Sequence, residues 1–129
     1  AFKIFCYFFF SLIALSVILS LANFTEPDKV KEIITKQSLI TLLLTITIGP
    51  LGEELLFRSY LQKRIGVILS SLLFSAMHYG YGSVSEVIAA FSFAIISGLE
   101  FRKTKNIYAC IIAHAFFNLL ALIVIFTVT

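Results

Sequence analysis

Six polar side chains stand out because they interrupt stretches that are otherwise almost free of charge. They are Glu53, Glu54, Arg58, His78, His114 and Asn118. Ionisable groups within apolar segments are costly to place in a membrane and point by default to a functional site. A carboxylate and an imidazole can activate water, and a His/Asn pair can donate hydrogen bonds to an oxyanion. These residue types therefore indicate hydrolytic chemistry.

Helical spacing assigns different directions to these side chains. Glu54 and Arg58 are four residues apart with the acid first, the order that favours an ion pair on one helix face. Glu53 is rotated by about 100° from its neighbour, so it can point toward a site. His114 and Asn118 are also four apart and project from one face of another helix.

The composition indicates that these groups lie in a membrane protein. The chain has 129 residues, is 60% hydrophobic and has 10 basic and 7 acidic residues. So few charged residues cannot supply the polar surface of a soluble domain. The basic residues form short clusters, which suit lipid headgroups better than nucleic acid. We therefore predict an integral membrane protein whose partner is the lipid bilayer and which binds no nucleic acid.

The order of apolar and polar segments predicts an all-α fold, a polytopic membrane bundle of about five helices. Residues 1–24 are long enough to span a bilayer, and 25–36 form a polar surface segment. Residues 37–129 form the bundle that carries the polar groups. Its predicted helices cover 37–64, 65–79, 83 to the polar stretch at 102–106, and 107–129.

Several local signals refine these helices. Pro50 removes a backbone hydrogen bond and is expected to strain the first helix of the bundle. The glycines of "YGYGS" at 80–84 predict a turn, and Ser83 with Glu86 resembles a capping box. Small residues at four-residue spacing predict close helix packing, at Ala90, Ala94 and Gly98. Cys6 and Cys110 lie in apolar runs, so we expect buried free thiols.

The depth of the polar groups predicts one site. If the helices alternate in direction, the connections near 65 and 106 lie on the same side of the membrane. Glu53, His78 and Asn118 are then each about twelve residues, or roughly 18 Å, from that side. His114 is about eight residues, or roughly 12 Å, from it. Three separate helices thus bring their polar groups to similar depth.

Three stretches resemble motifs of a known family. "EELLFR" at 53–58 is similar to an EExxxR motif, "FSAMH" at 74–78 to FxxxH, and "HAFFN" at 114–118 to HxxxN. These motifs, in this order, are typical of the CPBP family, the CAAX protease and bacteriocin-processing membrane peptidases, also called Abi proteins. The resemblance extends over about residues 37–129, and it implies a glutamic intramembrane endopeptidase.

The resemblance also implies a role for each motif residue. Glu53 would be the general base, assisted by His78, while His114 and Asn118 would form the oxyanion hole. The neighbouring acid and arginine of the first motif would support the site. The substrate would be a peptide or protein at the membrane, with no cofactor and no metal. A composition rich in Phe, Ile and Lys suggests a bacterial cell membrane, where family members serve bacteriocin maturation or self-immunity.

Two alternatives remain open from the residues alone. Two histidines and a glutamate are a plausible ligand set for Zn²⁺ or Fe²⁺ in a membrane metallopeptidase, although the HExxH spacing is absent. The second alternative is a non-catalytic immunity or scaffold protein that binds a bacteriocin or its receptor.

Overall fold

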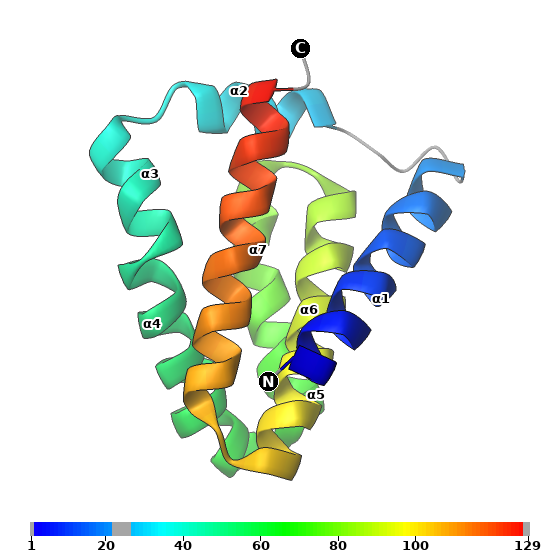
Figure 1. Cartoon of the computed structure of the whole chain (residues 1–129), viewed down its shortest axis with the longest axis vertical. Coiled ribbons are helices and arrows are strands. Elements are labelled where there is room, and N and C mark those ends of the chain that lie inside the picture. The colour runs from blue at the N-terminus through cyan, green and yellow to red at the C-terminus, as the bar shows by residue number, and fades with distance from the viewer. Residues whose placement is uncertain (1, 22–26, 128–129) are drawn as a thin grey trace.

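The computed structural model describes residues 2–21 and 27–127, and the regular elements in that part of the chain are all helical (Figure 1). Three long helices are continuous: α1 (Phe2–Leu21), α6 (Val84–Thr104) and α7 (Ile107–Thr127). A fourth arm is built from α3 (Leu39–Ile46), α4 (Ile48–Glu54) and the π-helix η1 (Leu55–Leu61), and a fifth from α5 (Gln62–Met77). The short helix α2 (Pro27–Thr35) lies across one end of the bundle. The predicted all-α bundle of about five helices is confirmed.

The predicted strain at Pro50 appears three residues earlier, at Thr47. This residue separates α3 from α4 and has φ −121° and ψ −80°, outside the helical range. A proline lacks an N–H and its ring clashes with the carbonyl of the residue four positions before it, here Ile46. The helix is therefore interrupted beside that carbonyl. The single helix predicted over 37–64 is in fact a broken arm, with a change to π geometry after Glu54.

Two glycines mark the changes of direction before and after the main part of α5, residues 67–77. Gly66 has φ +82° and ψ +173° and breaks the helical path, so the chain reverses direction there (Figure 1). This confirms the boundary predicted near residue 65. At the other end, His78–Tyr81 forms the 3₁₀ turn η2, and Gly82 follows with φ +65°. The turn predicted at 80–84 is confirmed, although His78 lies at its start rather than within an α-helix.

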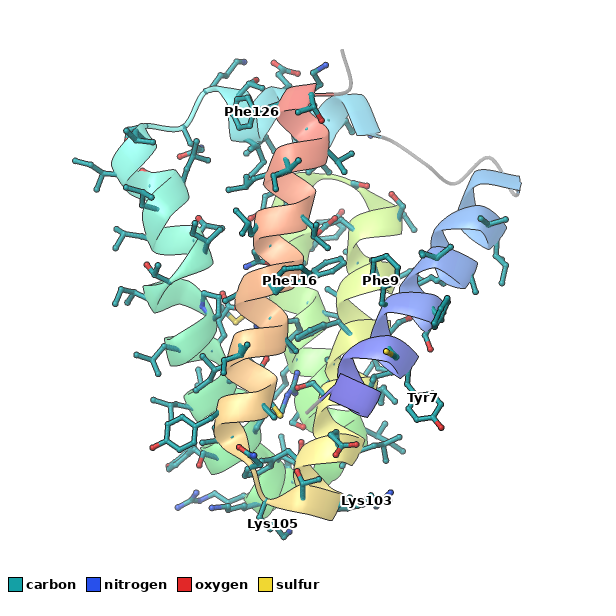
Figure 2. All side chains as sticks on the ribbon, in the orientation of Figure 1. Tyr7, Phe9, Lys103, Lys105, Phe116 and Phe126 are labelled. Carbon is teal, nitrogen blue, oxygen red and sulfur yellow. The ribbon has the colours of Figure 1, made fainter. Side chains whose placement is uncertain are left out.

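The pattern of burial is inverted relative to a soluble protein. Large apolar side chains cover the outside (Figure 2), and Leu39, Ile68 and Ile112 are each more than 60% exposed. The inside holds charged and hydroxylated side chains, with Glu54 and Arg58 both 0% exposed. Such a surface fits contact with lipid, while the polar groups find partners inside the bundle. Among the described residues, three stretches are long and apolar enough to cross a membrane: Leu39–Tyr81, which folds back at Gly66, Val84–Thr104 and Ile107–Thr127.

The N-terminal assignments fall partly outside the described residues. Helix α1 covers 2–21 of the segment 1–24 and contacts α6, and its role as a transmembrane helix stays a prediction. Helix α2 covers most of the polar segment 25–36 and has Val30 and Ile34 on its inner side. Both cysteines are free thiols, but only Cys110 is buried. The prediction of burial was wrong for Cys6, which is half-exposed because α1 lies on the outside of the bundle.

The stripe of small residues on α6 faces the interior, as predicted. Ala90, Ala94 and Gly98 are all buried, and α6 packs most extensively against α5. At Gly98 the approach is closest, because its carbonyl accepts a hydrogen bond of 2.8 Å from Nε2 of Gln62. A Cβ atom at this position would lie 2.8 Å from Oε1 of Gln62 and 2.9 Å from Cγ1 of Val67.

We therefore expect Gly98→Ala to lower the free energy of unfolding by about 1–3 kcal/mol, the typical cost of overpacking. Thermal unfolding in detergent measures this loss. Gly52→Ala is the matched control, since a Cβ at that helical glycine meets no atom within 4 Å. A Gly98→Ala protein that melts at or above the wild-type temperature would refute the close approach.

Candidate active site

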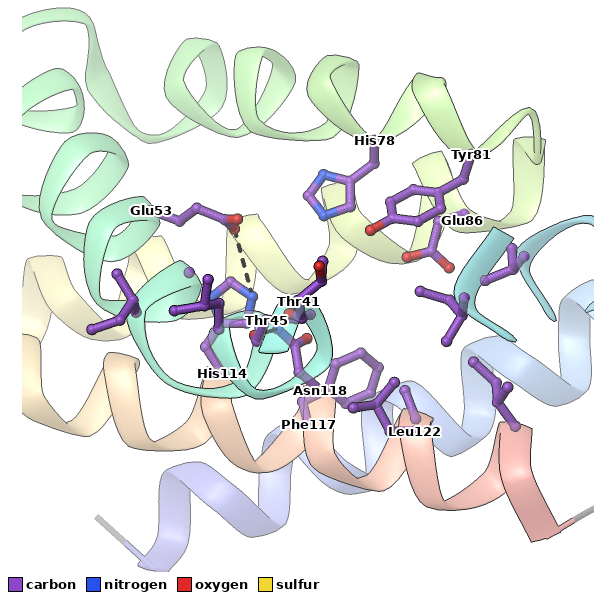
Figure 3. Close-up of a pocket in the computed structure, with 17 residues that line it drawn as sticks. Thr41, Thr45, Glu53, His78, Tyr81, Glu86, His114, Phe117, Asn118 and Leu122 are labelled. Carbon is purple, nitrogen blue, oxygen red and sulfur yellow. Dashed lines mark hydrogen bonds and ion pairs between the residues drawn. The ribbon is translucent and has the colours of Figure 1, made fainter. Parts of the chain in front are cut away.

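A cavity of about 380 Å³ extends from α2 at the end of the bundle to Glu53 in its interior (Figure 3). The four residues predicted to be catalytic all line it: Glu53, His78, His114 and Asn118. They come from α4, from the start of η2 and from α7. The structure thus brings together side chains that are up to 65 positions apart in the sequence (from 53 to 118). The rest of the lining is mainly apolar.

His78 is held in one tautomer by its own helix. Its Nδ1 lies 3.0 Å from the backbone oxygen of Phe74. A carbonyl oxygen only accepts hydrogen bonds, so Nδ1 carries the hydrogen and donates it. In the neutral ring, Nε2 then presents a lone pair to the cavity. The four-residue spacing of Phe74 and His78 also brings the two rings into contact, with their centroids 4.8 Å apart and their planes tilted by 35°.

The space between Glu53 and His78 is large enough for water. No hydrogen bond or ion pair joins these two side chains, and a second cavity of about 120 Å³ is lined by both of them together with Phe57, Phe74 and Tyr81. A water molecule occupies roughly 30 Å³ of liquid volume, so one or more fit. One carboxylate oxygen of Glu53, Oε2, is buried without a hydrogen-bond partner. A water in this space would have both a carboxylate and an imidazole nitrogen to accept its protons.

His114 lies between the two adjacent glutamates. Its Nδ1 donates to Oε1 of Glu54 at 3.0 Å, and its Nε2 lies 3.7 Å from Oε2 of Glu53, the pair marked in Figure 3. The side chain is buried, and its ring packs against Phe93 with centroids 4.6 Å apart. The sequence did not predict this bridge, because the two residues that His114 joins are on another helix 60 positions away.

Asn118 uses part of its hydrogen-bonding capacity to hold α3. Its Nδ2 donates to the backbone oxygen of Thr45 at 3.0 Å, two residues before the break at Thr47. An amide group has two N–H donors, so one remains for another acceptor. The oxyanion role of His114 and Asn118 stays a prediction, with one donor of each side chain already engaged.

The predicted ion pair between Glu54 and Arg58 is present and fully buried. Nε of Arg58 donates to Oε2 of Glu54 at 3.1 Å, and the hydroxyl of Ser97 donates to the same oxygen at 3.0 Å. The guanidinium lies over the ring of Phe74, with its carbon 5.2 Å from the centroid. Together with His114, this carboxylate accepts three hydrogen bonds, an arrangement that stabilises its ionised form.

The structure adds residues to the cavity that the sequence did not assign to it, chiefly Tyr81 and Glu86. Glu86 was predicted to complete a capping box with Ser83. Only half of that box forms: the Ser83 hydroxyl accepts from the backbone N–H of Glu86 at 3.3 Å, and no return bond joins the carboxylate to Ser83 among the described residues. The side chain turns to the cavity instead. An acid near the end of an apolar helix was the signal that could have identified it.

The histidine and glutamate side chains of the cavity do not form a metal site in this conformation. Among the residues described, no group of three or more His, Cys, Asp or Glu side chains is placed to hold a metal ion. Nδ1 of each histidine is occupied, on His78 by a carbonyl and on His114 by Glu54. The metallopeptidase alternative would therefore require these side chains to rearrange.

Comparison with known proteins gives a family match and bacterial relatives. The family model "Type II CAAX prenyl endopeptidase Rce1-like" matches residues 35–120. The chain is 33% identical to the protein YpbD of Bacillus subtilis over 87 residues, which are 65% of this chain and 45% of that protein. It is 32% identical to a Mycoplasma capricolum protein over 108 residues, 78% of this chain and 32% of that protein. It is 35% identical to the UPF0177 protein YxdF of Lactococcus lactis over 77 residues, 56% of this chain and 42% of that protein. The chain thus spans less than half the length of these relatives, and no solved structure matches it.

Proposed function

Because this chain belongs to the family of type II CAAX prenyl endopeptidase Rce1-like proteins, we propose that it is an intramembrane endopeptidase in which Glu53 activates water. The observation that carries this proposal is the space between Glu53 and His78, which is large enough for water and adjoins a cavity containing His114 and Asn118. A general base must lie within hydrogen-bond reach of the proton that it takes, directly or through one water.

The proposed reaction begins with a water held between the two side chains. Glu53 takes one proton from this water while the oxygen attacks the carbonyl carbon of the scissile peptide bond. His78 accepts a hydrogen bond from the same water through Nε2 and orients it. The tetrahedral intermediate then collapses, the C–N bond breaks, and the proton on Glu53 passes to the leaving amine. The products are a new carboxyl terminus and a new amino terminus.

The oxyanion would be stabilised by His114 and Asn118. As an imidazolium, His114 donates from both nitrogens, Nδ1 to Glu54 and Nε2 toward the cavity. Asn118 contributes the amide hydrogen that Thr45 does not use. Donors fixed before the reaction are effective because they need no reorganisation as charge develops. Glu54 acts through His114, since its carboxylate accepts the hydrogen bond from Nδ1 and orients the ring.

Broader assignments rest on the family and its bacterial members. We propose a bacterial cell membrane as the location and a membrane-associated peptide or protein as the substrate. Bacteriocin maturation or self-immunity would be roles compatible with such an activity. The non-catalytic alternative, an immunity or binding protein that uses the same pocket, predicts no new peptide termini from any substrate.

The proposal is tested with purified protein in lipid nanodiscs. This preparation is mixed with solubilised bacterial membrane proteins, and mass spectrometry identifies new amino and carboxyl termini. Hydrolysis in water enriched in ¹⁸O places the heavy isotope in each new carboxyl terminus. If no such labelled termini accumulate with the wild-type protein, it is not a peptidase toward this pool of proteins.

Metal chelation separates the proposed mechanism from the metallopeptidase alternative. If Glu53 and His78 activate water by proton transfer alone, activity should survive prolonged incubation with EDTA and 1,10-phenanthroline. Elemental analysis should also find far less than one transition metal per chain. A zinc enzyme would have its ligands within roughly 2.0–2.2 Å of the ion and would lose activity on chelation. Activity lost on removing zinc and regained on returning it would overturn the metal-free mechanism.

A further inference from the structure

The cavity carries a second carboxylate, Glu86, that the proposed chemistry does not use. It is the third residue of α6, at the end of that helix that lies nearer α2. Figure 3 shows His78 between Glu53 on one side and Tyr81 and Glu86, which lie beside each other, on the other side. Glu86 is therefore separated from the base by the imidazole of His78. This position is poorly suited to a role in proton transfer from the same water.

The carboxylate of Glu86 has no partner within the described part of the chain. It forms no hydrogen bond or ion pair there, although it interacts electrostatically with His78. No lysine or arginine is among the described residues that line the cavity. Lys29 of α2 donates to the backbone oxygen of Gly82 at 3.2 Å and lines a different hollow. A half-buried acid thus faces a largely apolar cavity that has no lysine or arginine among its described lining residues.

Burial in the cavity makes an unpaired charge on Glu86 costly, so a cation bound beside it would be stabilising. Positive ends of the peptide dipoles in the first turn of α6 stabilise negative charge at its third residue. Glu86 also lies within one turn of the end of its helix, at the end of the bundle that α2 covers (Figure 1). In a membrane, this depth is close to the interface, where long basic side chains extend toward water at lower cost than in the hydrocarbon core.

We propose that Glu86 is a specificity-determining residue that binds a lysine or arginine of the substrate, next to an apolar segment that reaches down to Glu53. This inference rests on the proposed peptidase function. Basic residues commonly flank the apolar spans of membrane proteins. A peptide of that kind would place its cation beside Glu86 and its apolar residues against the cavity wall, among Leu44, Phe117 and Leu122.

Binding rather than cleavage tests this assignment. The experiment uses the Glu53→Gln variant, which lacks the proposed base and keeps Glu86 as the acid that lines the cavity. It is placed in nanodiscs of phosphatidylcholine, a lipid without net charge. The probes are three fluorescent peptides with blocked ends and one apolar run, identical except for a lysine, glutamine or glutamate beside that run. We expect the lysine peptide to bind roughly ten- to hundredfold more tightly than the glutamine peptide, the range of a charge-assisted hydrogen bond.

Three further variants, each added to Glu53→Gln, locate the residue that causes the preference. Glu86→Gln should abolish it, whereas Glu100→Gln, the same change at the far end of the same helix, should leave it intact. Glu86→Lys should reverse it and favour the glutamate peptide, which controls for a general loss of structure. Equal binding of the lysine and glutamine peptides, absence of lysine-peptide binding, or a preference that survives Glu86→Gln would each overturn the proposal.

Cleavage of the same peptides by the protein with Glu53 intact is measured separately. Lysine-selective binding without any cleavage would support Glu86 as the recognition residue and contradict the peptidase function. Cleavage that Glu86→Gln slows equally for lysine and glutamine peptides would show that Glu86 acts on the catalytic groups, which contradicts the recognition role.

Discussion

Glu53→Gln is expected to lower peptide cleavage by a factor on the order of a hundred to ten thousand, the usual contribution of a general base. Glutamine keeps the size and shape of the side chain but has no charge and accepts protons poorly. The water between this residue and His78 would remain bound but would lose its base. Cleavage is measured as the rate at which ¹⁸O-labelled termini form in nanodiscs. The melting temperature should change little, since the Glu53 carboxylate accepts no hydrogen bond from the rest of the described chain.

Glu100→Gln is the matched control for this experiment. It makes the same chemical change on α6, outside the cavity, and should leave the rate within about twofold, as expected of a group remote from the reaction. A Glu53→Gln protein that cleaves at the wild-type rate would exclude this residue as the base. His114, which is 3.7 Å from the same carboxylate, would then need a different role as well.

Arg58→Ala should destabilise the protein by about 3–5 kcal/mol, the range measured when one partner of a buried ion pair is removed. The reason is that Glu54 would keep its charge in the interior with only the hydroxyl of Ser97 and the ring of His114 as partners. The loss is measured from thermal or denaturant unfolding in detergent. Turnover should fall too, because Glu54 orients His114.

The chain offers a matched control for this effect. Glu32 and Lys36 on the polar segment form another pair with the acid four residues before the base, at 2.6 Å, but their side chains are 68% and 69% exposed. Lys36→Ala should therefore cost less than about 1 kcal/mol, as solvent-exposed pairs do. An Arg58→Ala protein as stable as Lys36→Ala would show that the buried pair does not hold the bundle together.

Local sequence signals predicted the turn that contains Gly82 and the strain near Pro50. Both residues act through the backbone conformations that they allow or forbid, and these effects do not depend on distant residues. The π-helix after Glu54 had no comparable signal, because its wider turn accompanies contacts made between helices. The link between Gln62 and the carbonyl of Gly98 is one of these contacts.

The sequence predicted residues that the structure places around one cavity, but not most of the hydrogen bonds that connect them to other helices. Charged groups in apolar spans identified Glu53, His78 and His114, and helical spacing paired Glu54 with Arg58. The partners that cross between helices were missed, namely Ser97 beside Glu54 and Thr45 beside Asn118. Glu86 was interpreted as a cap because its spacing from Ser83 fits that motif. The structure shows that only the backbone of Glu86 takes part in the cap, so its side chain is free for the cavity.

The most direct test of a Glu53-dependent peptidase is a comparison of membrane-protein termini in cells. Two strains express equal amounts of the wild-type protein and of Glu53→Gln, and quantitative mass spectrometry compares all amino and carboxyl termini in their membranes. The account predicts a small set of termini that occur only with the wild-type protein, with cleavage at or within apolar segments. Identical termini in the two strains, at equal and verified expression, would contradict it.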